Sequence, residues 1–189
     1  MKKRLAVFAS GSGTNFEAIA QACADGRLDA EVALMVCDKP GAAVVARAER
    51  FGVPAFVASP KSFGSKAEFE REVIRRLDAA KIDLVCLAGY MRIISEELLD
   101  AYGGLIINIH PSLLPAFKGA HAVEDAVAYG VKVYGITIHW VNADLDGGKI
   151  IAQRAFEYDG DDPEEVHRLG QKIEHTLYVE TRQKLLKQI

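Results

Sequence analysis

Short apolar runs alternate with amphipathic segments along most of this sequence. Residues 5–9 (LAVFA) are continuously apolar and too few for a helix, which predicts a strand buried on both faces of a sheet. Residues 66–80 instead carry apolar side chains at the spacing of an amphipathic helix. Further strands are predicted at 31–37, 53–57, 83–88 and 105–109, and further helices at 15–24, 42–51, 95–101 and 119–129. Strands that alternate with helices predict a parallel sheet covered on both faces.

The pattern changes after Gly130. Residues 133–141 and 149–158 have the pattern of two strands joined by a short acidic loop, and strands that close in sequence usually pair antiparallel. Asp162 and Pro163 suit the N-cap and first position of a long helix over 163–187. The sequence therefore predicts one α/β domain over residues 1–189. We expect a Rossmann-like three-layer sandwich whose mostly parallel sheet has an antiparallel portion near the C-terminus.

The overall composition narrows the range of partners. The 189 residues carry a formal net charge of −3, which gives no broad electrostatic reason to bind nucleic acid or an anionic membrane. No stretch approaches the roughly 20 apolar residues of a membrane span, and the first apolar run ends at Ser10, too early for a signal peptide. Cys23, Cys37 and Cys86 lie in separate apolar stretches without a C-x-x-C motif, as reduced core residues do. These features predict a soluble cytoplasmic protein.

A glycine-rich turn, SGSGTN at residues 10–15, follows the first predicted strand and precedes a helix. Glycines allow a sharp turn there, and the free N–H groups at the start of a helix attract an anion. Phe16 stands where a dinucleotide fingerprint requires its third glycine, and the Gly-Lys-Ser/Thr of a triphosphate-binding loop is missing. The turn therefore favours a single phosphate as its ligand. A tight turn without a ligand is the alternative.

Asn108 and His110 stand out in the apolar stretch that precedes Pro111. Their spacing places both on one face of a strand, at the C-terminal end where open α/β sheets bind ligands. A buried amide or imidazole without a partner costs on the order of 1–3 kcal/mol, so the pair needs a role. Asn108 can donate to a developing oxyanion and His110 can exchange a proton near neutral pH, which suits acyl transfer to an external nucleophile. A hydrogen-bonded pair that only holds the following loop is the alternative.

An acidic loop follows the strand predicted at 133–141. Asp146 precedes two glycines and could be no more than a turn residue, since Asp-Gly is a common turn pair. If the loop folds back over the end of the strand that carries His110, the Asp146 carboxylate could instead orient the imidazole and favour its protonated form. No metal site is predicted, because His110 and His121 have no third candidate ligand nearby.

Several motifs together resemble one known family. Residues 108–115 (NIHPSLLP), 135–141 (GITIHWV) and 145–148 (LDGG) are similar to the signature blocks of the 10-formyltetrahydrofolate-dependent formyl transferases. The turn at 11–15 and the chain length resemble those members of the family that act on glycinamide ribonucleotide. The resemblance implies an enzyme of de novo purine biosynthesis that uses 10-formyltetrahydrofolate as co-substrate and needs no metal.

The resemblance also implies roles for individual residues. The residues implied to bind the acceptor substrate, glycinamide ribonucleotide, are Gly13, Thr14, Asn15 and Glu174. The residues implied to bind the folate are Lys66, Met91, Arg92, Ile93, Ile94 and Asn108. Asn108, His110 and Asp146 would be the catalytic residues, with Asp146 sustaining the positive charge of His110. Lys66 replaces an arginine that the family often has, which keeps the charge but loses the bidentate fork.

The implied reaction is a direct transfer through a tetrahedral intermediate that Asn108 and His110 stabilise. Residues 1–100 would form the phosphate and substrate half of the domain, and residues 101–189 the folate and catalytic half. The expected partners are the two small-molecule substrates, in a monomer or a homodimer. Two alternatives are a formyltetrahydrofolate deformylase, which hydrolyses the same co-substrate, and a non-catalytic module that binds a phosphoribosyl ligand.

Overall fold

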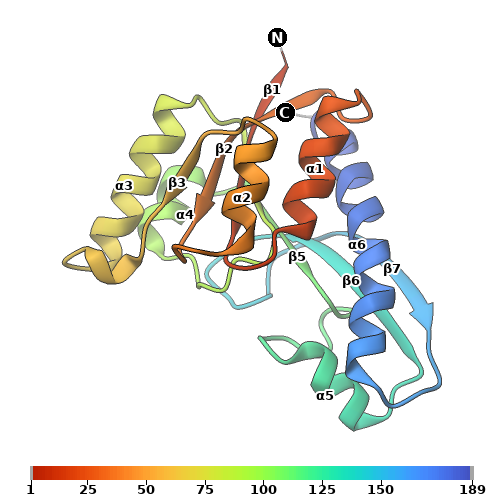
Figure 1. The fold of residues 1–189 in the computed structure, drawn as a ribbon. Helices are drawn as coiled ribbons and strands as arrows, with labels where there is room; N and C mark the ends of the chain where they lie inside the picture. Colours follow the sequence, from red (N-terminus) through yellow and green to blue (C-terminus); the bar gives the residue numbers. More distant parts are fainter. Residues whose placement is uncertain (1, 188–189) are drawn as a thin grey trace.

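Seven strands form one sheet in the computed structural model, which describes residues 2–187. The strands are β1 (Lys3–Ala9), β2 (Ala30–Cys37), β3 (Ala55–Val57), β4 (Leu84–Leu87), β5 (Ile106–His110), β6 (Val133–Trp140) and β7 (Ile150–Glu157). Their order is β3-β2-β1-β4-β5-β6-β7 (Figure 1). Strands β1 to β5 are parallel, whereas β6 runs antiparallel to β5 and β7 antiparallel to β6. The predicted mixed sheet is confirmed.

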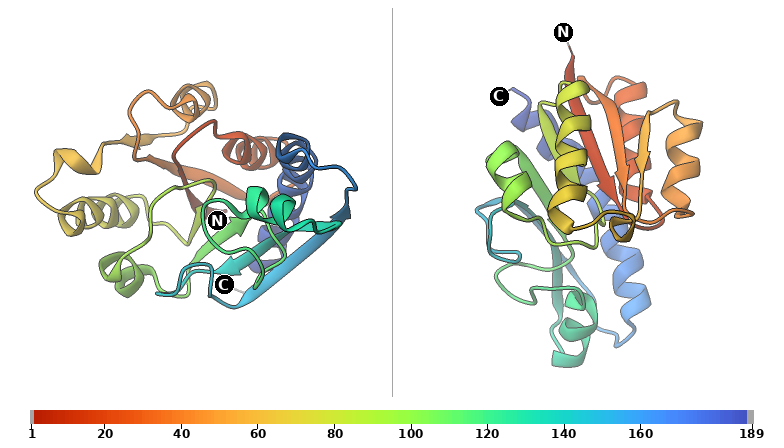
Figure 2. Two further views of the ribbon diagram at one scale, coloured as in Figure 1. Left: turned by 90° about the horizontal axis from the view of Figure 1, so that it is seen from below. Right: turned by 90° about the vertical axis from the view of Figure 1, so that its left-hand side faces the viewer.

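Helices cover both faces of this sheet. They are α1 (Thr14–Ala24), α2 (Ala43–Arg50), α3 (Lys66–Ala79), α4 (Glu96–Tyr102), α5 (Ala122–Tyr129) and α6 (Pro163–Leu185), with the 3-10 helix η1 (Pro60–Ser62) before α3. In β1, Leu5 and Val7 pack with residues of α1, α2 and α6, whereas Phe8 packs on the opposite face with residues of α3 and α4. Figure 2 shows these two helical layers with the sheet between them. The apolar run of β1 is thus explained by burial on both sides, and the three-layer sandwich is confirmed.

Most predicted elements differ from the observed ones by one or two residues at their ends, and two larger local differences stand out. The helix predicted at 119–129 begins only at Ala122, because Gly119 has a left-handed φ of 92° and donates its N–H to the Asp146 carboxylate 2.8 Å away. The 3-10 helix η1 was not expected, and the Ser59 hydroxyl accepts the Lys61 N–H at its start. Neither difference changes the order of the strands.

The parallel strands direct three connecting segments to one edge of the sheet. The glycine turn follows β1, residues 88–95 follow β4, and residues 111–121 follow β5, so all three lie at the carboxyl ends of parallel strands. Helix α6 crosses this region from the other end of the chain and packs beside α1 (Figure 1). Its predicted start is confirmed, because the Asp162 carboxylate accepts the Glu164 N–H at 2.9 Å. None of the helices within residues 2–187 has the length and apolar character that a membrane span requires.

Candidate active site

Strand β5 ends with Asn108, Ile109 and His110. Ile107 and Ile109 pack against the α1 and α6 layer, whereas Ile106 packs against the α3 and α4 layer. Because side chains alternate along a strand, Asn108 and His110 share the face of Ile106. The prediction that the two polar residues lie on one face of the strand is confirmed.

His110 has an acceptor near each ring nitrogen. Its Nε2 lies 2.8 Å from the Phe117 carbonyl oxygen, and its Nδ1 lies 3.5 Å from Asp146 Oδ2. A carbonyl oxygen only accepts, so Nε2 carries a proton and donates it to Phe117. The Nδ1 atom then faces a carboxylate, an arrangement that is favourable when Nδ1 is protonated as well. His110 is only 5% exposed, so both of its ring nitrogens face groups of the protein.

Asp146 folds back from the β6–β7 loop onto the end of β5. Its Oδ2 accepts the Gly119 N–H, and its Oδ1 lies 3.6 Å from His139 Nε2. Burial of the Asp146 side chain opposes ionisation, but the facing His139 side chain, the hydrogen bond from the Gly119 N–H and the nearby His110 side chain outweigh burial, so the pKa of the carboxyl group is lowered. Asp146 also has a left-handed φ of 47°. This conformation is uncommon for a residue other than glycine and persists only where surrounding contacts stabilise it.

His139 is a member of this cluster that the sequence analysis missed. It pairs with Asn108 across the antiparallel β5–β6 ladder. Its Nδ1 lies 2.9 Å from the Trp140 carbonyl oxygen and so carries a proton, and Asn108 Nδ2 lies 3.2 Å from its Nε2. In the neutral ring, Nε2 accepts one N–H of Asn108, which leaves the second N–H of the amide available to an oxygen of a substrate. His139 thereby fixes the orientation of the Asn108 amide.

The loop after β5 is held by polar groups of the two antiparallel strands. The Thr137 hydroxyl, fully buried, accepts the Leu114 N–H at 3.1 Å and donates to the Ser112 carbonyl at 2.7 Å. The Gln153 amide donates to the Leu114 carbonyl at 2.9 Å. Each of these contacts satisfies a backbone group that would otherwise be buried without a partner. They fix the path of the chain between His110 and Phe117.

The glycine turn begins α1 and meets α6. Gly13 is the N-cap of α1 with a left-handed φ of 75°, and a Cβ atom there would lie 2.4 Å from Val44 Cγ2. Only glycine suits both the conformation and the space. Asn15 Nδ2 donates to Glu174 Oε2 at 2.8 Å, and Gln171 donates to the Thr14 hydroxyl at 3.0 Å. The predicted acceptor-site residues from the two ends of the chain therefore lie together, beside the free N–H groups of the first turn of α1.

The segment after β4 is tied to this turn by a buried carboxylate. Asp38 is 2% exposed and accepts the Ser10 hydroxyl at 2.5 Å and Arg92 Nε at 2.6 Å. The Ser10 hydroxyl accepts the Met91 N–H at 2.9 Å. Met91 and Ile93 are largely exposed, whereas Ile94 is buried in the layer of α3 and α4. Among the residues predicted for the folate, Met91 and Ile93 thus have exposed apolar side chains and Ile94 anchors the segment.

Known proteins of similar sequence and structure identify the family of this chain. Residues 3–181 match the family described as formyl transferase. The chain belongs to the formyl transferase family. It is 51% identical to phosphoribosylglycinamide formyltransferase of Bacillus subtilis (strain 168) over 185 residues, which cover 97% of this chain and 95% of the relative.

Solved structures of formyl transferases have the same fold. Glycinamide ribonucleotide transformylase 1 from Geobacillus kaustophilus is 52% identical, with a TM-score of 0.95, over 98% of this chain and 100% of that chain. Phosphoribosylglycinamide formyltransferase from Bacillus halodurans is 51% identical, with a TM-score of 0.94, over 97% of this chain and 95% of that chain. The similarity therefore includes the antiparallel strands that complete the cluster at His110.

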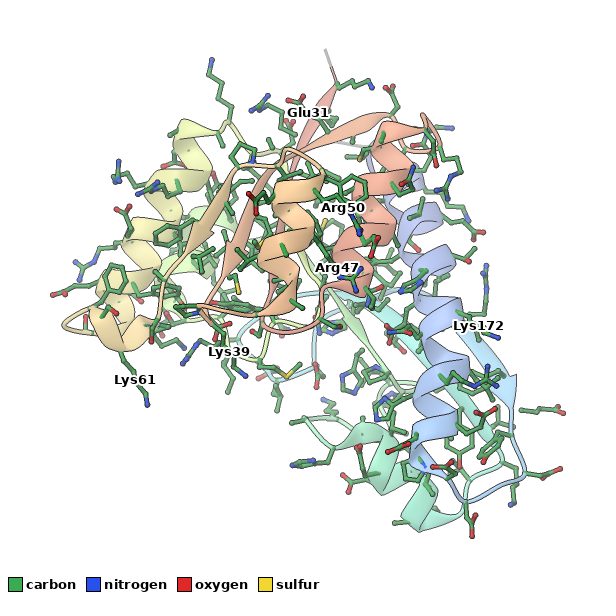
Figure 3. All side chains as sticks on the ribbon, viewed as in Figure 1. Glu31, Lys39, Arg47, Arg50, Lys61 and Lys172 are labelled. Atoms are coloured by element: carbon green, nitrogen blue, oxygen red, sulfur yellow. The ribbon has the colours of Figure 1, made fainter. Side chains whose placement is uncertain are left out.

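In this formyl transferase the predicted residues form two groups along the carboxyl edge of the sheet. Asn108, His110 and Asp146 form one group, and Asn15 and Glu174 form the other. Arg47 of α2 supports the second group by donating to the Ser12 carbonyl at 2.7 Å (Figure 3). Within residues 2–187 the structure has no group of three or more His, Cys, Asp or Glu side chains that could hold a metal ion.

Proposed function

We propose that this chain transfers the formyl group of 10-formyltetrahydrofolate to the glycyl amine of glycinamide ribonucleotide, a step of de novo purine biosynthesis. The observation that carries the proposal is the cluster in which Asp146 faces His110 and His139 orients Asn108. Relatives that cover nearly the whole chain at about half identity bear the name of this activity, which supports the choice of both substrates.

The acceptor would bind at the glycine turn. The phosphate of glycinamide ribonucleotide would accept the N–H groups of the first turn of α1, next to Gly13 and Thr14, where the helix dipole favours negative charge. Glu174 bonds to Asn15 and could accept a ribose hydroxyl with its remaining lone pairs. A phosphate-bearing small molecule suits this end of the site, in keeping with the absence of any overall positive charge.

The transfer would proceed without a covalent enzyme intermediate. The glycyl amine attacks the formyl carbon, a new C–N bond forms, and the carbonyl oxygen becomes an oxyanion. The free N–H of Asn108 and the positive charge of His110 stabilise that oxyanion. The bond from the formyl carbon to the folate nitrogen then breaks, and the proton lost by the amine balances the proton gained by the folate nitrogen. A single oxyanion donor is worth about 10²–10³ in rate.

Asp146 would keep His110 in the protonated form that this step needs. Its carboxylate faces Nδ1, while the Nε2 proton lies on the Phe117 carbonyl oxygen. Delivery of that proton to the folate nitrogen requires the Phe117 hydrogen bond to be exchanged for one to the substrate, a tightening common when an enzyme binds its reactants. Asp146 therefore acts through His110 and does not touch the substrate.

The folate would extend from Asn108 along the segment after β4. In this arrangement Met91, Arg92, Ile93 and Ile94 line its site and Lys66 meets its acidic end. Residues 1–100 supply the phosphate turn, and residues 101–189 supply the catalytic cluster. We propose that the enzyme acts in the cytoplasm on these two small molecules. Either a monomer or a homodimer could catalyse the reaction, because all residues of the cluster belong to one chain.

An absorbance assay with 10-formyltetrahydrofolate tests the proposal directly. Formyl loss that depends on added glycinamide ribonucleotide supports transfer. Formyl loss at the same rate without the amine identifies a deformylase. Ribonucleotide binding without any formyl loss identifies a binding module, and either result refutes the proposed function.

A further inference from the structure

Tyr178 lies where helix α6 meets the ends of two parallel strands. The side chain is buried, and its hydroxyl oxygen lies 2.6 Å from the Leu87 carbonyl oxygen and 3.4 Å from the Ile107 carbonyl oxygen. A carbonyl oxygen only accepts, so the hydroxyl donates its proton towards both, with the shorter bond to Leu87. Leu87 ends β4, and Ile107 is the second residue of β5. One hydroxyl of α6 therefore contacts two neighbouring strands.

Both of these carbonyl groups adjoin Asn108. The Ile107 carbonyl belongs to the peptide bond that leads into Asn108, and Leu87 pairs with Asn108 in the register of β4 and β5. Tyr178 packs in the layer of α1 and α6, whereas the Asn108 side chain projects from the opposite face of the sheet. Tyr178 therefore fixes the backbone from which the Asn108 amide projects, without touching the amide itself.

The same helix carries Glu174, four residues before Tyr178 and so one helical turn away. The Glu174 carboxylate accepts the Asn15 amide at 2.8 Å, which ties this part of α6 to the glycine turn. The proposed acceptor site and the strand that carries Asn108 are thus connected through one turn of helix and one hydroxyl.

Arg182 holds the Tyr178 ring from the next turn of α6. Its guanidinium carbon lies 3.8 Å from the ring centroid, and its Nε donates to the Tyr178 carbonyl oxygen at 3.0 Å. Arg182 is fully buried, and its two terminal nitrogens have no hydrogen-bond partner among residues 2–187. A buried cation is costly without a partner, and attraction to the face of an aromatic ring offsets part of that cost. The stacked guanidinium and the bonded hydroxyl together hold the ring in one orientation.

We propose that Tyr178 is a positioning residue that sets the distance between the acceptor bound at α6 and the catalytic end of β5. The inference rests on the proposed function. Each substrate region keeps its own contacts without this hydroxyl, because Asn15 still meets Glu174 and Asp38 still holds Arg92. Only the placement of one reactant relative to the other changes. A displacement of about 1 Å between bound reactants is enough to slow a reaction strongly.

Tyr178→Phe removes only the hydroxyl and tests this role. We expect kcat for formyl transfer to fall by about threefold to tenfold, the equivalent in rate of one ordinary hydrogen bond. The KM for each substrate should stay within about twofold, because the contacts of each substrate region remain. Circular dichroism verifies the fold of the variant.

Two buried tyrosines provide matched controls. Tyr102→Phe also removes a hydrogen bond, since the Tyr102 hydroxyl donates to the Asp78 carboxylate at 2.8 Å in the layer of α3 and α4. Tyr134→Phe removes a hydroxyl that has no partner among residues 2–187. Both variants should keep the kcat of the unaltered enzyme.

An unchanged kcat in Tyr178→Phe would overturn the positioning role, as would an equal loss in Tyr102→Phe or a loss confined to KM. All three results leave transfer to glycinamide ribonucleotide by the unaltered enzyme standing. The side-chain amide NMR signal of Asn108, identified by its absence in Asn108→Ala, measures the same positioning without turnover. It should shift in Tyr178→Phe and not in Tyr102→Phe. An unshifted signal in Tyr178→Phe refutes the inference even if the enzyme catalyses another reaction.

Discussion

Asp38 joins the two proposed substrate regions of this enzyme, and its removal should uncouple them. The carboxylate is almost fully buried and accepts one hydrogen bond from Ser10, at the start of the glycine turn, and one from Arg92, in the proposed folate segment. In Asp38→Asn the amide keeps one acceptor oxygen but presents an N–H where a carboxylate oxygen stood. The variant cannot satisfy both donors and also loses the charge that Arg92 faces.

The expected change in the KM for the folate follows from how far Arg92, the charged partner of Asp38, is exposed to solvent. A hydrogen bond to a charged group is worth about 1.5–3 kcal/mol. Arg92 is 39% exposed, so water recovers part of its loss and the lower end of that range applies. A loss of about 1.4 kcal/mol corresponds to a tenfold change in an equilibrium constant. We expect Asp38→Asn to raise the KM for the folate about tenfold, because Met91 and Arg92 lose their anchor.

Steady-state kinetics with each substrate varied in turn measure this effect. The KM for glycinamide ribonucleotide should change far less than the KM for the folate, and kcat should stay within a few-fold. Asp100→Asn is the control, since Asp100 is exposed on α4. Equal changes in both KM values, or no change in either, would refute the idea that Asp38 positions the folate segment.

Three further perturbations have distinct expected outcomes. His139→Gln should lower kcat up to about tenfold, measured at saturating substrates, because Asn108 loses the neutral hydrogen bond that orients it. Gly13→Ala should destabilise the fold by about 2–4 kcal/mol in urea unfolding, since it adds a steric clash to a left-handed conformation. Gly26→Ala, which has a similar φ and open space, should cost only about 1–2 kcal/mol. The lowered pKa of Asp146 means that its carboxylate stabilises the folded state above the ordinary value of 3.8, and that this stabilisation is lost as the pH falls through the lower folded-state pKa. Urea unfolding from pH 6 to pH 2.5 should therefore show a smaller acid-induced loss of stability in Asp146→Asn than in the unaltered protein.

The sequence pattern was sufficient to predict the layers of the fold and to single out Asn108 and His110 of the proposed catalytic cluster, whereas Asp146 rested mainly on the family resemblance. Strands such as β1 are apolar on both faces, so their burial between helices follows from composition alone. Asn108 and His110 were identified because the two-residue period of a strand places them together without any knowledge of tertiary structure. These predictions depend only on local pattern.

The rest of the cluster depends on long-range geometry that local pattern does not encode. His139 reaches Asn108 through the register of β5 and β6, and a shift of one residue would turn every side chain of β6 to the other face. Asp146 reaches His110 only because the β6–β7 loop folds back and accepts the Gly119 N–H. That same contact starts α5 three residues later than predicted. Thr137 and His139 are two residues apart in β6, so the sequence indicated that they share a face. It did not show which residues of β5 they would meet.

If Asp146 acts through His110, the two residues should behave as one unit in kinetics. Single variants His110→Ala and Asp146→Asn should each lower kcat by about 10²–10³, because each removes the cationic donor to the oxyanion. Groups that act as one unit are not additive, so the double variant should be little slower than the slower single variant. Asp144→Asn is the matched control, since Asp144 is exposed in the same loop.

The most direct test is the rate of formyl transfer to glycinamide ribonucleotide at saturating substrates in these four variants, with circular dichroism to verify their fold. We predict severe, non-additive losses in His110→Ala, Asp146→Asn and the double variant, and nearly unchanged turnover in Asp144→Asn. Near-normal turnover in either His110→Ala or Asp146→Asn, or losses that multiply in the double variant, would contradict the assignment of His110 and Asp146 as one catalytic unit.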